Sequence, residues 1–161
     1  MSPSTEEDEA VRIVRNIAVP VQRVYDAFTD PEMLVRWMGP EGYRATRAEV
    51  DARIGGSCRI WVSQDGEDAG SFLWEFVEMT PPERLVFSFA FGGPGEVLEE
   101  HRSRMTLEFR EEGVDETELT LTHDRLGAAP PGGHAGVNTG WTQALGKLIV
   151  YLESEGTEAT A

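Results

Sequence analysis

Hydrophobic and polar residues alternate through most of the chain, which is typical of strands with one buried and one exposed face. The pattern predicts a first strand over residues 11–17 and six more over 43–52, 56–63, 70–79, 84–91, 101–111 and 116–124. Short breaks rich in glycine, proline or aspartate separate these six strands, as expected of antiparallel hairpins. The body of the protein is therefore expected to be an antiparallel sheet.

Three other segments show the spacing of a helix. Apolar residues within 21–28 predict a short helix after the first strand, and Asp30 followed by Pro31 predicts the start of a second one. The run 140–152 predicts a long amphipathic helix near the C-terminus. Its apolar stripe needs a partner, and the sheet offers the largest apolar face. We therefore expect an α+β fold in which this helix closes the sheet and encloses a pocket.

The alternation also assigns a face to each strand residue. The inward rows are expected to be Phe72, Trp74 and Phe76; Leu85, Phe87 and Phe89; Met105, Leu107 and Phe109; and Leu119, Leu121 and His123. With a hairpin tip at 113–115, Met105 falls opposite His123, and Leu107 falls opposite Leu121. These rows would form the sheet side of the pocket.

The strand over 56–63 can face either way. A two-residue turn at Asp65-Gly66 would point Trp61 inward. A longer loop would instead point inward Cys58, Ile60 and Val62. An outward Trp61 would be a natural contact in a homodimer.

Charge and composition narrow the possible partners. The net charge of −15 disfavours nucleic acid and anionic membranes, and a single cysteine cannot form an intramolecular disulfide. The chain of 161 residues predicts one domain over 11–153, with a disordered polar tail at 1–10 and a C-terminal tail at 154–161. Because no signal segment and no run of about 20 apolar residues occurs, we expect a soluble, cytoplasmic protein.

The sequence contains no phosphate loop, nucleophile elbow or spaced metal ligands, so we expect no cofactor and no metal site. In the expected register, His101 lies roughly 13 Å along its strand from the residue opposite His123. His134 is expected to be a cap or a surface residue. His123 is the strongest polar candidate, because it ends an inward row and can change charge near neutral pH. It either bonds to backbone at the strand end, or serves as a hydrogen-bonding or acid–base group at the pocket mouth.

Several segments match a known superfamily in order and spacing, namely 24–32 with Trp37, Gly55-Gly56, 81–87, 119–123, His134, and Gly140-Trp141 with Leu145 and Leu148. Through them the chain resembles the START-like, helix-grip (SRPBCC) superfamily, and within it the branch of homologues of the activator of the heat-shock-protein ATPase. The resemblance covers about residues 11–153. It implies a curved antiparallel sheet wrapped around the C-terminal helix with a cavity between them, and it favours Ile60 and Val62 over Trp61 as inward residues.

A groove lined by aromatic side chains with few polar groups is typical of sites for apolar ligands. We therefore expect this protein to bind a small, largely hydrophobic or aromatic molecule, and the resemblance implies a role in stress response or natural-product resistance. The expected site residues are Trp37, Met38, Ile60, Val62, Phe72, Trp74, Phe87, Phe89, Met105, Leu107, His123 and Trp141.

Two other functions remain open. An enzyme of the cyclase or hydratase kind would use His123 for proton transfer, with Asp124 or Arg104 nearby. The sequence places no second acid–base group beside His123, which favours a binding protein over an enzyme. A role as a co-chaperone or interaction domain is implied by the resemblance alone.

Overall fold

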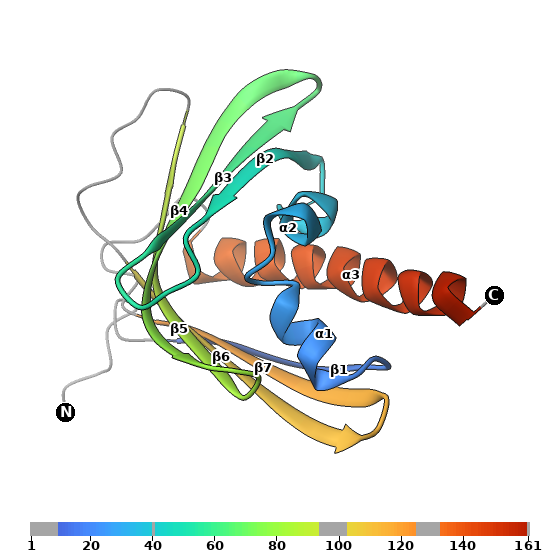
Figure 1. Ribbon diagram of the computed structural model, residues 1–161. Coiled ribbons are helices and arrows are strands. Elements are labelled where there is room, and N and C mark those ends of the chain that lie inside the picture. The colour runs from blue at the N-terminus through green and yellow to red at the C-terminus, as the bar shows by residue number, and fades with distance from the viewer. Residues whose placement is uncertain (1–9, 40, 94–102, 125–132, 161) are drawn as a thin grey trace.

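The computed structural model describes residues 10–39, 41–93, 103–124 and 133–160 (Figure 1). Its elements are β1 (Val11–Ile17), α1 (Val21–Asp26), α2 (Pro31–Trp37), β2 (Tyr43–Val50), β3 (Ser57–Gln64), β4 (Glu67–Thr80), β5 (Arg84–Gly92), β6 (Ser103–Gly113), β7 (Glu116–Asp124) and α3 (Gly133–Thr160). One strand, two short helices, six strands and a long helix follow one another as predicted, which confirms the α+β, helix-grip fold.

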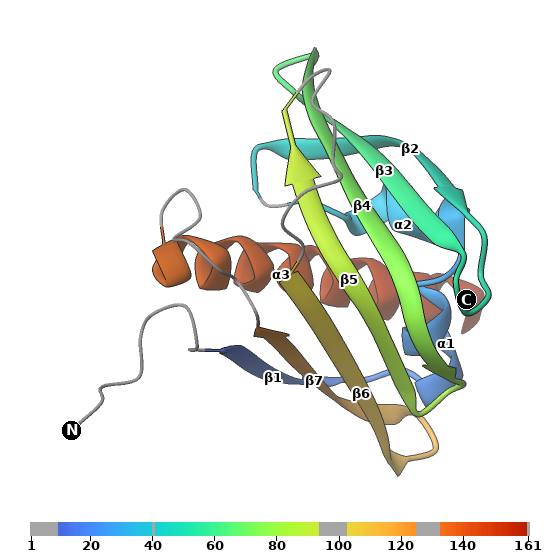
Figure 2. The same ribbon diagram turned by 90° about the vertical axis from the view of Figure 1, so that its left-hand side faces the viewer.

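The strands form one antiparallel sheet in the order β1-β7-β6-β5-β4-β3-β2. The sheet curves strongly, and α3 lies along its concave side with α1 and α2 beside it (Figure 1). Figure 2 looks onto the opposite, convex face, with α3 behind the strands. The predicted register of the last hairpin is confirmed, since Met105 pairs with His123 and Leu107 pairs with Leu121.

The face of β3 is set by a bulge and not by the turn before β4. The two-residue turn is present, with positive φ angles of 54° at Asp65 and 82° at Gly66. However, Val62 pairs with Gly70 whereas Ser63 pairs with Asp68, so one residue of β4 has no partner between them. This extra residue reverses the face. The prediction that a two-residue turn points Trp61 inward is therefore wrong.

The inward residues of β3 are those that the resemblance favoured. Ile60 and Val62 are buried on the concave side. Trp61 lies on the opposite face, where the guanidinium carbon of Arg47 stands 4.5 Å from the centre of its ring and that of Arg59 stands 5.4 Å away. Such cation–π contacts give the outer face of β2 and β3 a mixed aromatic and basic character.

Gly70, directly after the bulge, has a φ of 112° and its N–H donates to the Asp68 carboxylate at 2.9 Å. That φ lies in a region which side-chain-bearing residues rarely adopt. The strand also runs very close to Gly92 of β5 at this point. Gly70 is therefore required both by its backbone angle and by the lack of space.

The helices follow the predicted signals with one difference. Asp30 caps α2, accepting a hydrogen bond from the N–H of Glu32 at 2.9 Å, and Pro31 begins the helix. α3 starts earlier than expected, at Gly133, and continues to Thr160, through residues assigned to a tail. Residues 154–160 contain no large apolar side chain, so hydrophobic periodicity could not reveal that they are helical. No helix in the described ranges is long and apolar enough to span a membrane.

Hydrogen bonds fix α3 at both edges of the sheet, near β1 and near β2. The N–H of Ala18, just after β1, donates to Glu153 at 3.0 Å. Near β2, the N–H of Glu41 donates to Gln143 at 3.0 Å, and Lys147 donates to the carbonyl of Tyr43 at 3.0 Å. These bonds hold the helix across the concave face, where it buries the side chains of Ala144, Leu145, Leu148 and Leu152.

Cys58 belongs to the buried inward row of β3, and burial raises its pKa to about 12. A thiol with so high a pKa is almost entirely protonated and unreactive at neutral pH. We expect native protein at pH 8 not to react with 5,5′-dithiobis(2-nitrobenzoic acid), and protein in guanidinium to react with one equivalent. Rapid labelling of the native protein would show that solvent reaches the groove at Cys58.

Candidate functional site

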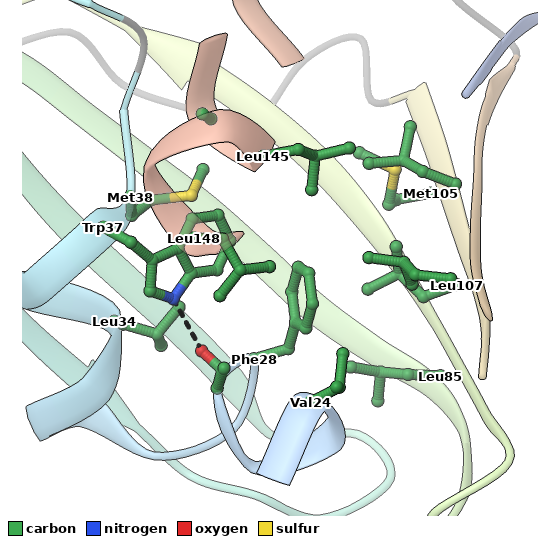
Figure 3. Close-up of a cluster of buried hydrophobic side chains, with 14 of the residues drawn as sticks. Val24, Phe28, Leu34, Trp37, Met38, Leu85, Met105, Leu107, Leu145 and Leu148 are labelled. Carbon is green, nitrogen blue, oxygen red and sulfur yellow. Dashed lines mark hydrogen bonds between the residues drawn. The ribbon is translucent and has the colours of Figure 1, made fainter. Parts of the chain in front are cut away.

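The predicted site residues fall into two groups, and the larger group forms the packed core between sheet and α3. These side chains are at most 2% exposed, namely Trp37, Met38, Ile60, Val62, Trp74, Phe87, Met105 and Leu107. Figure 3 shows several of them in contact with Leu145 and Leu148 of α3, and it shows the indole of Trp37 donating to the carbonyl of Ala27 at 3.0 Å. This part of the groove is occupied by the protein's own side chains.

The smaller group lies at one end of the groove and is aromatic. The centres of the rings of Phe72 and Phe89 are 5.6 Å apart, and the ring of Phe89 lies 5.7 Å from Trp141 and 4.8 Å from His123. Phe91, which was not predicted, joins them at 4.8 Å from Phe72. We call Phe72, Phe89, Phe91, His123 and Trp141 the aromatic end cluster. It combines residues of β4, β5, β7 and α3.

Exposure distinguishes this cluster from the core. Phe91 is 45% exposed and Phe89 is partly exposed, whereas His123 and Trp141 are buried behind them. An exposed phenylalanine that continues an inward row marks the place where that row leaves the core. The alternation of Leu85, Phe87 and Phe89 extends to Phe91 by the same period of two, so the sequence does contain the signal for this residue.

His123 is held by a chain of hydrogen bonds within the cluster. The indole N–H of Trp141 donates to Nδ1 of His123 at 3.1 Å. Nε2 of His123 lies 2.6 Å from the hydroxyl of Ser103, which in turn donates to the carbonyl of Phe89 at 3.2 Å. An indole nitrogen can only donate, so Nδ1 must accept and the imidazole proton must lie on Nε2, where it points at Ser103.

These hydrogen bonds run in the opposite direction to those of a catalytic serine–histidine pair. A histidine that activates serine accepts the hydroxyl proton, and its other nitrogen donates to a carboxylate. Here His123 donates to Ser103 and accepts from Trp141, so it cannot remove the hydroxyl proton while these bonds persist. The arrangement stabilises the end of the groove and gives Ser103 no nucleophilic activation.

Burial lowers the pKa of His123 to about 4, so that the imidazole is neutral at neutral pH. The suggested acid–base partners do not reach it. Arg104 and Asp124 are paired with each other in the register and neighbour the Met105–His123 pair, so their side chains point to the opposite face of the sheet. His101 lies outside the described residues, and His134 lies in the first turn of α3.

A pocket of about 570 Å³ lies elsewhere, near the turns that join β4 to β5 and β6 to β7. It is lined by Val21, Pro82, Glu83, Glu108, Phe109, Arg110, Glu111, Glu118 and Thr120. None of the predicted site residues is among them, and four of its nine lining residues are glutamates. The described residues contain no group of three or more possible metal ligands.

Comparison with solved structures supports the fold. A protein from Chromobacterium violaceum is 26% identical, with 89% of this chain and 96% of that chain covered and a TM-score of 0.73. An HSP90 activator from Plasmodium falciparum is 29% identical, with 89% and 96% covered and a TM-score of 0.69. An AHSA1 protein from Silicibacter pomeroyi is 20% identical, with 91% and 99% covered and a TM-score of 0.77.

No curated protein sequence matches the chain. The family model described as Activator of Hsp90 ATPase homolog 1-like protein matches residues 18–153, from the residue after β1 through most of α3. This range contains every residue of the aromatic end cluster and the core beneath it. The chain therefore belongs to the Activator of Hsp90 ATPase homolog 1-like family.

Proposed function

We propose that the protein binds a small, largely hydrophobic or aromatic molecule at the aromatic end cluster. The observation that carries this proposal is the partial exposure of Phe89 and Phe91 in a row that is otherwise buried. Exposed aromatic side chains beside a concave surface are favourable for apolar ligands, because binding removes their area from water. His123, Ser103 and Trp141 bond to one another and give this end a fixed shape.

The protonation state of His123 favours a binding function over a catalytic one. Proton transfer needs a group whose pKa lies near the working pH and which can reach the substrate. Both nitrogens of His123 are already used in hydrogen bonds, and burial holds its pKa at about 4. The imidazole is thus a fixed part of the wall.

The proposal is tested by titration with N-phenyl-1-naphthylamine, a neutral aromatic probe that fluoresces in apolar sites. We expect one saturable site, and we expect Phe89→Ala to weaken binding about tenfold, because Phe89 contacts three other rings of the cluster. Trp61→Ala is the matched control, since it removes a larger aromatic side chain from the opposite face of the sheet. Its affinity should stay within twofold of wild type.

Either of two results would contradict this site. The first is the absence of saturable binding to the wild-type protein, and the second is an equal loss of affinity in Phe89→Ala and Trp61→Ala. A natural ligand is sought by native mass spectrometry of the protein purified from its own source, followed by extraction of the bound compound.

Contact with a chaperone ATPase is a second candidate. It is favoured by the 29% identity to the HSP90 activator from Plasmodium falciparum over 96% of that chain. The test is the ATPase rate of a purified chaperone of the HSP90 type with and without this protein. No increase at saturating concentration would dismiss this candidate and leave the ligand proposal unaffected.

A further inference from the structure

Several polar side-chain groups on the inner face of the sheet and of the helices that cover it are paired in the described part of the chain. The indole of Trp37 donates to Ala27, that of Trp141 donates to His123, and the hydroxyl of Thr117 donates to the carbonyl of Val19 at 2.9 Å. Four buried side-chain atoms of the described residues have no hydrogen-bond partner, namely Nε of Arg23, the hydroxyl of Tyr25, the indole nitrogen of Trp74 and one carboxylate oxygen of Asp124. Arg23 and Tyr25 belong to α1, and Asp124 points to the opposite face of the sheet, so Trp74 alone presents an unpaired group from the inner face of the strands.

The hydroxyl of Tyr25 and the indole N–H of Trp74 lie at different ends of the groove. Tyr25 packs against Phe109 with their ring centres 5.4 Å apart. Phe109 is four residues along β6 from Met105, or roughly 14 Å at the rise of an extended strand. Trp74 instead pairs across the strands with Phe89, and it is the next inward residue of β4 after Phe72. Trp74 thus lies directly beneath the aromatic end cluster.

The side chain of Trp74 is held in place by the ring of Phe87. Its ring stacks on that of Phe87, with centres 4.2 Å apart and planes 16° from parallel. A buried N–H that has lost its water and gained no partner carries a free-energy cost. Any molecule that brings an acceptor to this nitrogen recovers part of that cost, which is a specific gain that apolar contact alone cannot supply.

We propose that the N–H of Trp74 is the polar anchor of the ligand site, and that the ligand is a planar aromatic compound carrying a hydrogen-bond acceptor such as a ketone oxygen. This inference rests on the proposed function and names the class of ligand. The acceptor enters first and reaches Trp74 when the side chains of Phe72 and Phe89 move aside. The aromatic part of the ligand then lies among the rings of the cluster.

The same contacts favour an acceptor over a group that can only donate on the buried end of the ligand. Ser103, His123 and Trp141 use their hydrogen-bonding groups on one another and on the carbonyl of Phe89. An ammonium group placed beside Trp74 could only donate and would meet another donor. A carbonyl oxygen, in contrast, meets the one free N–H that the inner face of the described sheet presents.

The experiment compares 1-indanone with indane, which share a bicyclic skeleton and differ by the ketone oxygen. Each compound is titrated into ¹⁵N-labelled wild-type protein and into Trp74→Phe, and the indole N–H signals of the four tryptophans are followed by NMR. We expect Trp74→Phe to weaken 1-indanone about three- to tenfold and to leave indane within twofold. The Trp74 indole proton should move downfield with 1-indanone alone.

Trp37→Phe is the matched control, because it removes an indole N–H that already bonds to Ala27. It should lower stability and leave the affinity for both compounds within twofold. If Trp74→Phe weakened the binding of both compounds equally, Trp74 would contribute only to the shape of the site, and the proposal that its N–H anchors the ligand would be wrong. The proposal would also be wrong if Trp74→Phe changed the affinity for neither compound. Binding of neither compound to the wild-type protein up to its solubility would overturn the anchor. If N-phenyl-1-naphthylamine also failed to bind, the proposed function would fail with it.

Discussion

Replacing Gly70 with alanine is expected to destabilise the protein by about 4 kcal/mol or more, or to prevent folding. A Cβ atom at this position would lie 2.1 Å from the carbonyl oxygen of Gly92, and the φ of 112° is strained for any residue with a side chain. The obstructing atom belongs to the backbone of the neighbouring strand. Relief would therefore require β4 and β5 to separate beside the bulge.

The measurement is urea denaturation followed by circular dichroism. Gly140→Ala is the matched control, because Gly140 lies within α3 and, apart from the adjoining helix backbone, no atom lies within 4 Å of the position of its Cβ. Alanine there should stabilise the helix by up to about 1 kcal/mol. A Gly70→Ala protein as stable as the wild type would show that β4 and β5 are not as close at Gly92 as described.

Acidification is expected to remove about 3 kcal/mol of stability through His123 alone. Its pKa falls from an ordinary 6.5 to about 4 on folding, because burial disfavours the charged imidazolium. The folded state therefore favours the neutral form. This contribution is fully present above pH 6.5 and is lost progressively as the pH falls to 4 and below. Protonation also forces Nδ1 to carry a proton that faces the N–H of Trp141.

Carboxylates titrate in part of the same range, so the effect of His123 must be measured as a difference. The free energy of unfolding is determined between pH 7.5 and 4 for the wild type and for His123→Gln, which has no titrating group and can both donate and accept. The wild type should lose about 3 kcal/mol more than the variant over this range. Parallel curves for the two proteins would mean that His123 is accessible to water.

The order of elements and most strand faces could be predicted because both depend on local chemistry. The alternation of apolar and polar residues determines which residues of β5, β6 and β7 share a face. The position of the last hairpin turn determines the register in which Met105 pairs with His123. The bulge in β4 has no comparable signal. The residue directly after it, Gly70, lies close to Gly92, which is 22 positions away in the sequence.

The site was predictable in part. The sequence placed His123 at the end of an inward row, but its partners come from other elements. Trp141 reaches it from α3, and Ser103 reaches it from the start of β6. Whether a histidine accepts or donates depends on such contacts, and these depend on how the helix docks. No spacing rule within one strand could therefore show that His123 is neutral and locked.

The position of α3 has a consequence for the newly made chain. α3 follows all the strands of the sheet in the sequence, yet it supplies the leucines that cover their inner face. A ribosome that has completed β7 must add roughly 30 more residues before Glu153 can bond to Ala18, which takes a few seconds at 5–20 residues per second. During those seconds the nascent sheet presents its phenylalanines and leucines to solvent. The chain therefore needs protection from aggregation until α3 has been translated, even if the sheet has already formed.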